Sequence, residues 1–225
     1  MRYFGSLRGV VATLMFTVFF CTCSEKPGAG RHISLPVSSG INGSWNYLGI
    51  SKGSKAPDFV LYSQDGDRFR LSEHLKDGKP HALISGSYTC DISRGNLPSV
   101  NDMTKRYGSA VDFFMVYTID AHPIDTVSPY SSDGKIWIPE KNIRDGVKAP
   151  QPRTYGERVE LSKKWKEENH ILAPVLVDDP SNDYWVNYGQ APNMVYIIQP
   201  DGTVYYRRNF LKAEELETAL HEIAE

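Results

Sequence analysis

A short apolar run that ends just before a cysteine constrains the fold of this chain more than any other feature. The run from Ala82 to Gly86 is followed within four residues by Cys90. An apolar run of this length that ends in small residues is typical of a buried strand. Helical spacing then extends from Asn96 to Tyr107, with Pro98 tolerable in the first turn. We therefore expect the thiol of Cys90 between the end of a strand and the start of a helix.

Apolar and helical patterns continue along the chain on both sides of this unit. Strands are expected at 59–62, 68–71, 82–86, 111–119, 175–178, 194–199 and 203–207, and helices at 155–169, 184–188 and 213–223. Gly66 marks a hairpin turn, and Ser72 is expected to cap a short helix after it. The proline-rich stretch to about residue 151 reads as a long loop, which we expect to cover or line a site. This order predicts a sheet with helices on both faces.

Two features favour the thioredoxin-like version of this architecture. They are a cysteine that ends the first core strand and opens the first helix, and Pro192, which leads into a later hairpin. We expect an α/β fold with a central mixed β-sheet flanked by helices, an N-terminal β-hairpin and a long inserted loop. In this fold class the peptide bond before Pro192 is expected to be cis and to face the thiol.

The first residues have the pattern of an export signal. Arg2 and Arg8 precede an apolar run over residues 9–20, which is short for a bilayer span but suits a secretory signal. Cys21 and Cys23 follow, as at the start of a bacterial lipoprotein; plain cleavage or a retained anchor are the alternatives. We expect a signal peptide at 1–23, a flexible tether and lead-in at 24–55, and the folded domain at 56–225. The protein is then exported to a bacterial cell envelope, with membrane contact only through a lipid anchor.

Charge and cysteine content exclude several functions. The net charge is −2 with no basic field, so we expect small-molecule or protein partners and no nucleic acid.

If Cys21 and Cys23 belong to the export signal, Cys90 is alone in the domain. Without a C-x-x-C motif around Cys90, a self-contained dithiol oxidoreductase is not expected. Ser87 stands where a peroxiredoxin would carry threonine, and a copper carrier would need a second thiol. We expect no bound metal or organic cofactor.

Cys90 is placed to act as a nucleophile. A thiol reacts as its thiolate, which amide N–H groups at a helix start stabilise. Its polar neighbours favour a reactive cysteine over a buried apolar one. Arg94 is either a further stabiliser of the thiolate or an ordinary surface arginine.

His122 ends the strand next to the one that delivers Cys90. It is a candidate general acid or polar clamp, with Asp120 and Asp125 placed to orient its ring. The remaining histidines are expected at the surface or in loops: His32, His74, His81, His170 and His221. In the long loop, Trp137 either helps to hold an aromatic ligand or packs the loop onto the core.

Four sequence blocks resemble those of the iodothyronine deiodinases, which are thioredoxin-fold selenoenzymes. Residues 86–90 resemble the family's Gly-Ser-Cys-Thr-selenocysteine, so that Cys90 occupies the selenocysteine position. Residues 117–122 with Asp125 resemble the strand that ends in Glu-Ala-His. Residues 192–199 resemble the Pro-x-x-Leu-Tyr-Ile-Ile-Gln strand, and 173–178 resemble the strand before it. The resemblance covers most of the chain from about residue 56 onward.

The resemblance implies reductive removal of iodide from an iodinated aromatic, thyroxine-like substrate. Cys90 would be the nucleophile, His122 would contact the substrate, and an external thiol or thioredoxin-like reductant would regenerate the enzyme. The candidate substrate-binding residues are Thr89, Asp120, Asp125, Trp137 and Pro192. One alternative is a one-cysteine thiol peroxidase that passes through a sulfenic acid. Another is a lipid-anchored, non-catalytic binding module, which an inert, buried Cys90 would favour. The oligomeric state stays open.

Overall fold

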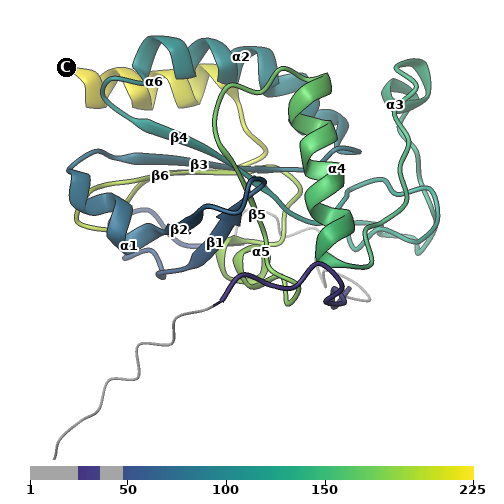
Figure 1. The fold of residues 1–225 in the computed structure, drawn as a ribbon. Coiled ribbons are helices and arrows are strands. Elements are labelled where there is room, and N and C mark those ends of the chain that lie inside the picture. Colours follow the sequence, from purple (N-terminus) through teal and green to yellow (C-terminus); the bar gives the residue numbers. More distant parts are fainter. Residues whose placement is uncertain (1–24, 36–47) are drawn as a thin grey trace, which may run out of the picture.

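The structure is a computed structural model that describes residues 25–35 and 48–225 as an open β-sheet with helices on both faces (Figure 1). The strands lie in the order β2-β1-β5-β4-β3-β6-β7. They are β1 (Val60–Ser63), β2 (Arg68–Arg70), β3 (His81–Gly86), β4 (Asp112–Tyr117), β5 (Val175–Val177), β6 (Met194–Ile198) and β7 (Val204–Asn209). The helices are α1 (Leu71–His74), the 3-10 turn η2 (Leu75–Asp77), α2 (Asp91–Tyr107), α3 (Glu140–Arg144), α4 (Tyr155–Glu168), α5 (Asp183–Tyr188) and α6 (Ala213–Ala224).

The centre of the sheet is parallel and its flanks are antiparallel. Strand β3 runs parallel to β4, from the pair His81 and Asp112 to the pair Gly86 and Tyr117. Strand β4 runs parallel to β5, whereas β1 and β6 are antiparallel to the strands beside them. The carboxyl ends of β3, β4 and β5 therefore meet at one edge of the sheet, where ligands of open α/β sheets commonly bind.

Alternating side chains on the strands fill two cores. On β3, Ala82 and Ile84 belong to the core that includes residues of α2, α4 and α6, whereas Leu83 belongs to the core that includes residues of α1 and α5. Figure 1 shows α2 and α6 above the sheet and α1 and α5 below it. Strands buried on both faces read as continuous apolar runs, which is why the sequence marked them clearly.

The two predicted hairpins are confirmed. Strands β1 and β2 pair antiparallel around Gly66, and β6 and β7 pair around the turn that holds Gly202. Both glycines have positive φ values, +99° and +83°. A side chain is strained in this conformation, so glycine suits these turns.

The helix after Cys90 begins earlier than its spacing predicts. Helix α2 starts at Asp91, not at Asn96, and Pro98 lies in its interior instead of its first turn. The first residues of α2 are mostly polar, so apolar periodicity does not reveal them; Cys90 is the N-cap. Helix α3 also interrupts the stretch expected to be irregular throughout.

The predicted capping role of Ser72 is wrong. Helix α1 begins after Arg70 and has no side-chain cap from its own N-cap residue. Instead the backbone N–H and the hydroxyl of Ser72 donate to the carboxylate of Asp58, at 2.9 and 2.8 Å. An acceptor from the segment just before β1 therefore satisfies the helix start, a contact between distant residues that local sequence cannot reveal.

His81 is buried, which corrects its predicted place at the surface. It begins β3, and its ring lies against Phe69 and Phe114. Neither ring nitrogen has a hydrogen-bond partner among the described residues. Burial lowers the pKa of His81, so the neutral form is favoured.

Part of the expected tether is attached to the domain. The N–H of Ile33 donates to the carbonyl of Arg153, and the N–H of Tyr155 donates to the carbonyl of Arg31. The predicted signal peptide, with Cys21 and Cys23, lies outside the described residues, as do residues 36–47. No helix within the described part of the chain has the length and apolar character needed to cross a membrane.

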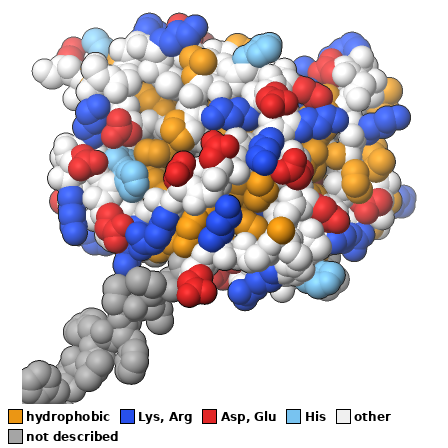
Figure 2. All heavy atoms as spheres, in the orientation of Figure 1, with side chains coloured by type: hydrophobic (Ala, Val, Ile, Leu, Met, Phe, Trp, Pro, Cys, Tyr) orange, Lys and Arg blue, Asp and Glu red, His pale blue; other side chains and the backbone are white. Residues whose placement is uncertain are grey.

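Charges of both signs are mixed over the surface. Figure 2 shows Lys and Arg side chains next to Asp and Glu across the visible face. Several of them form exposed ion pairs, such as Arg68 with Glu73 and Arg106 with Glu217. Exposed pairs of this kind contribute little to stability, about 0 to 1 kcal/mol each.

Candidate active site

Cys90 caps the N-terminus of α2, as the sequence predicts for its position. Its Sγ accepts a hydrogen bond from the N–H of Ser93 at 3.3 Å. The side chain is nevertheless buried, with 1% of its surface exposed. Burial raises the pKa of the thiol to about 11, and the hydrogen bonds from Ser93 only partly oppose this shift. In this closed arrangement the thiol is therefore protonated at neutral pH.

His122 follows β4 and lies against Asp91, the residue that follows Cys90 and that the sequence did not suggest as its partner. Its Nε2 is 3.5 Å from Oδ1 of Asp91, the first residue of α2. Burial lowers the pKa of His122, and Asp91 opposes that shift. The predicted orienting residues, Asp120 and Asp125, bind elsewhere. Asp91 takes their place because the early start of α2 directs it toward the end of β4.

Asp120 and Thr89 hold the Cys90 loop together and do not line the pocket. Oδ1 of Asp120 accepts from the N–H and the hydroxyl of Thr89, at 2.9 and 2.8 Å. Its Oδ2 accepts from the hydroxyl of Tyr117 at 2.6 Å. Both Asp120 and Thr89 are fully buried. Their predicted contact with substrate is therefore replaced by a role in positioning the loop before Cys90.

Asp125 is also directed away from the Cys90 pocket. Its carboxylate accepts from the N–H of Gln151 at 2.8 Å and pairs with Arg153 at 3.2 Å. These contacts fasten the start of the long loop to the segment before α4. The short sequence spacing between His122 and Asp125 therefore does not bring the Asp125 carboxylate to the His122 ring, because the chain turns between the two residues.

Arg94 is neither a surface arginine nor a partner of the thiol. Its side chain is mostly buried and donates to Asn142 Oδ1 at 2.5 Å, and it pairs with Asp145 at 3.3 Å. The Nδ2 group of Asn142 donates to the carbonyl of Thr89 at 2.7 Å. Arg94 and Asn142 therefore tie α3 of the long loop to the segment that carries Cys90.

A pocket of about 620 Å³ lies beside Cys90, between α2 and the long loop. Its apolar lining comes mainly from Ile92, Tyr130, Ile136, Trp137, Pro192 and Phe210. His122 and Asp91 also line the pocket. Apolar walls with a few polar groups are typical of small-molecule sites. The long loop thus lines a pocket at the start of α2.

Trp137 does not pack the loop onto the core. Its side chain is 62% exposed, and its ring meets the His122 ring edge-on with 4.6 Å between centroids. This places an aromatic face at the mouth of the pocket, directly against the candidate acid. Trp137 is therefore positioned to contact a ligand.

Pro192 lines the pocket, but its predicted cis bond is wrong. The peptide bonds of the described residues, including the one before Pro192, are all trans. The trans form is the lower in free energy for most X-Pro bonds. The next residue, Asn193, holds this segment in place: it donates to the carbonyl of Ser85 at 2.8 Å and accepts from the N–H of Leu211 at 3.2 Å.

Tyr130 connects the long loop to α5 next to the thiol. Its hydroxyl accepts a hydrogen bond from Nε1 of Trp185 at 2.7 Å. The pKa of Tyr130 is raised by burial and, to a smaller degree, by the nearby Cys90 and Asp120. In the sequence, the only signal for Tyr130 is an aromatic side chain in a proline-rich loop. Among the described residues no three His, Cys, Asp or Glu side chains gather as a metal site would require.

Known proteins match the chain over most of its length. A sequence model of the family described as iodothyronine deiodinase matches residues 45–216. Type I iodothyronine deiodinase of Xenopus laevis is 24% identical over 155 residues, which cover 69% of this chain and 55% of that protein. Thyroxine 5-deiodinase of Ovis aries is 27% identical over 161 residues, with 69% and 49% covered. The chain thus spans about half the length of these relatives.

Solved structures identify the fold. A thiol:disulfide interchange protein from Bacteroides sp. has a TM-score of 0.53 at 14% identity, with 78% of this chain and 92% of that chain covered. The thioredoxin domain of a thiol-disulfide oxidoreductase from Bacteroides vulgatus has a TM-score of 0.52 at 14% identity, covering 78% and 99%. The predicted thioredoxin-like fold is confirmed.

Proposed function

Because the chain belongs to the iodothyronine deiodinase family, we propose that it is a thiol-dependent oxidoreductase acting on an iodinated aromatic, thyroxine-like compound. Cys90 is the proposed nucleophile, and an external thiol is the reductant. The observation that supports this most strongly is the position of Cys90, at the start of α2 beside an apolar pocket that His122 and Asp91 also line.

The proposed reaction balances with two external thiols. The thiol proton of Cys90 passes to His122, and the thiolate attacks the iodine atom. The S–I bond forms as the C–I bond breaks, and the ring carbon takes a proton from His122. One external thiol then attacks the Cys90 sulfur, releasing iodide and a proton and leaving a mixed disulfide. A second external thiol releases Cys90. In total one aryl iodide and two thiols give the deiodinated ring, a disulfide, iodide and a proton.

The pocket walls suit both the aromatic ring and the phenol group of such a substrate. Trp137 and Ile92 offer exposed apolar surface for an aromatic ring, and Pro192 lines the same pocket. The His122 ring, held near Asp91, provides a polar contact for a phenol. Ring stacking contributes about 0.5 to 1.5 kcal/mol beyond the buried area.

Reaction requires the long loop to move, because Cys90 is buried. Tyr130 of this loop lies close enough to Cys90 for the thiol to affect its pKa, and its hydrogen bond to Trp185 holds it in place. Displacement of Tyr130 would expose the sulfur, lower the pKa of the thiol toward its ordinary value and open a path from the pocket. We propose that substrate binding favours this open state.

Burial of Cys90 is the observation that favours a second candidate, a binding module without catalysis. In that case the pocket holds an aromatic ligand and the thiol stays inert, as its raised pKa implies. The peroxidase alternative has no such support, since the likeness to peroxidoxin BcpB of Mycobacterium tuberculosis, with a TM-score of 0.50 at 14% identity, concerns the fold alone.

One set of assays separates these functions. The full chain and its Cys90→Ser variant are incubated with iodinated thyronines and tyrosines, with hydrogen peroxide, and with dithiothreitol as reductant. Deiodination predicts iodide release that the variant lacks. Peroxide consumption without iodide release would assign the peroxidase function. Saturable binding of the iodinated ring by both proteins, with neither reaction, would assign the binding module.

We also propose that the protein is exported and lipid-anchored through Cys21 or Cys23, with residues 24–55 leading to the domain at 56–225. The reaction proposed above needs no bound metal or organic cofactor. Incorporation of a labelled fatty acid in bacterial cells, compared among the full chain, Cys21→Ser and Cys23→Ser, tests the anchor. Label that persists in both single variants and in the double variant would overturn it.

A further inference from the structure

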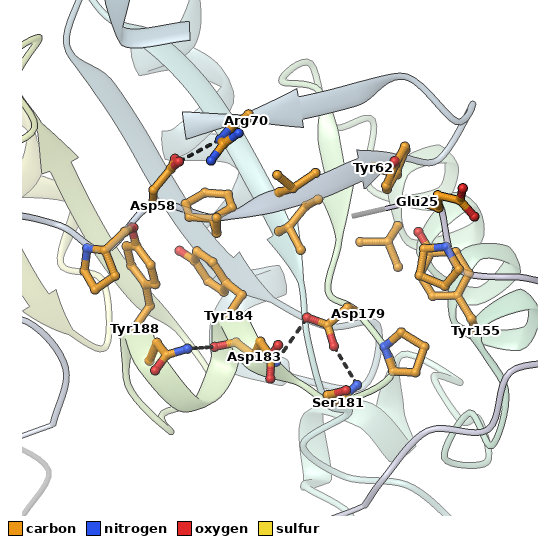
Figure 3. Close-up of a pocket in the computed structure, with 18 of the residues that line it drawn as sticks. Glu25, Asp58, Tyr62, Arg70, Tyr155, Asp179, Ser181, Asp183, Tyr184 and Tyr188 are labelled. Carbon is orange, nitrogen blue, oxygen red and sulfur yellow. Dashed lines mark hydrogen bonds and ion pairs between the residues drawn. The ribbon is translucent and has the colours of Figure 1, made fainter. Parts of the chain in front are cut away.

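A second cavity of about 490 Å³ lies between β1 and the chain that follows β5. It shares no lining residue with the Cys90 pocket. Figure 3 shows β1 along one side, with Asp179, Ser181 and Asp183 on the other. Volumes of this size are typical of small-molecule sites.

Aromatic rings form one wall of this cavity. The ring of Phe59 meets those of Tyr184 and Tyr188 edge-on, each with 5.2 Å between centroids. Tyr184 and Tyr188 are stacked at 4.5 Å and nearly parallel. Such a wall is suited to a flat apolar group, and the electron-rich faces of tyrosine also attract cations.

Carboxylates outnumber basic groups around the cavity. Its charged lining residues are Glu25, Asp58, Asp179 and Asp183 on one hand, and Arg31 and Arg70 on the other. The positive charge of Arg70 is balanced by Asp58, with which it forms an ion pair at 2.7 Å. Asp179 accepts backbone N–H groups of Ser181 and Asp183, at 2.6 and 3.3 Å. Partial burial and the nearby Asp179 raise the pKa of Asp183. A bound cation would relieve this repulsion.

Two buried hydroxyl groups in the cavity wall point independently to a ligand. Tyr155 and Tyr184 are each 2% exposed, and neither hydroxyl has a hydrogen-bond partner among the described residues. A buried polar group left without a partner costs about 1 to 3 kcal/mol. Asp179 lies between the two tyrosines in Figure 3 and affects the pKa of Tyr155. The cavity wall therefore holds hydroxyl groups with unused hydrogen-bonding capacity.

We propose that this cavity binds an organic ammonium ion with an aromatic body. The ammonium group lies against Asp179 and Asp183 and donates to the Tyr155 hydroxyl, and the ring packs on Phe59 and Tyr184. A metal ion is a poorer fit, since no three His, Cys, Asp or Glu side chains among the described residues are arranged to bind one. The inference does not depend on the reaction proposed for Cys90.

Calorimetric titration of the full chain tests this proposal with three probes of similar size and different charge: 2-phenylethylammonium, 2-phenylethanol and phenylacetate. The cation is expected to bind at least tenfold more tightly than the alcohol, and the anion more weakly than both. Asp183→Asn should weaken binding of the cation about tenfold, and Tyr155→Phe severalfold. Asp102→Asn, an exposed carboxylate on α2, should leave it unchanged.

Cys90→Ser separates this proposal from the proposed function, because it should leave binding of the cation unaltered. Circular dichroism of each variant checks that it folds. Equal affinity for the cation and the neutral alcohol would overturn the proposal. An unchanged affinity in folded Asp183→Asn and Tyr155→Phe would overturn it as well.

Discussion

His122 Nε2 lies 3.5 Å from Oδ1 of Asp91, the residue that directly follows the candidate nucleophile. The start of α2 therefore carries both the thiol and the carboxylate that supports the candidate acid. This arrangement follows from capping of α2 by Cys90, since the next residue then turns toward the end of β4.

Asp91→Asn is expected to lower the pKa of His122 further. Burial already lowers it, and the Asp91 carboxylate is the main opposing influence. Titration of the His122 ring signals by NMR measures this change. Asp125→Asn is the matched control and should leave the pKa unaltered, because Asp125 binds Gln151 and Arg153 instead. A larger effect from Asp125 than from Asp91 would refute the assignment.

Tyr130→Phe is expected to speed alkylation of Cys90 by iodoacetamide about fivefold. The variant removes the hydroxyl that accepts from Trp185, and loss of about 1 kcal/mol of hydrogen bonding would open the loop more often. Mass spectrometry of the Cys90 peptide follows the reaction. The control Tyr205→Phe, on the edge strand β7, should leave the rate unchanged. An unaltered rate in Tyr130→Phe would show that Tyr130 does not limit access.

Thr89→Val is expected to destabilise the domain by about 2 kcal/mol, because the buried carboxylate of Asp120 loses a donor. Urea unfolding measures the change in free energy. The control is Thr218→Val. The Thr218 hydroxyl donates to the carbonyl of Glu214 on the exposed face of α6, so this variant should lose much less free energy of unfolding. Equal losses in the two variants would contradict the positioning role given to Thr89 and Asp120.

The loss of folding stability at acidic pH is expected to depend on His81. Its pKa is lowered in the folded state by burial, while the unfolded chain takes a proton near pH 6.5. The unfolded state then binds more protons below that pH, so the free energy of unfolding falls as the pH drops. His81→Phe should reduce the loss between pH 7 and pH 5 by about 1 to 2 kcal/mol in urea unfolding. His221→Gln is the exposed control; equal pH dependence in wild type and His81→Phe would refute the prediction.

Sequence patterns located the sheet because its central strands are buried on both faces. The runs ending at Gly86 and Tyr117 carry that signal without any long-range information. The same reasoning placed Cys90 at a helix start, since a strand, a short loop and a helix must follow one another. It missed the first residues of α2, whose polar side chains show no apolar period.

The contacts of the site were harder to predict because they join distant segments. Asp58 satisfies the start of α1, and Arg94 bonds to α3, neither of which a local pattern encodes. Asp120 was singled out for its closeness to His122, yet its buried carboxylate turns to Thr89. His81 shows the same limit, since its burial is set by the aromatic rings that surround it.

The most direct test is whether deiodination leaves its mark on Cys90. The full chain is mixed without oxygen with 3,5-diiodotyrosine and a small amount of glutathione, and the Cys90 peptide and free iodide are measured together. The account predicts a glutathione disulfide on Cys90 that forms only with the iodinated compound, in equal amount to the iodide released, and none with tyrosine. Iodide release with Cys90 unmodified, or no release while the ligand is bound, would contradict it.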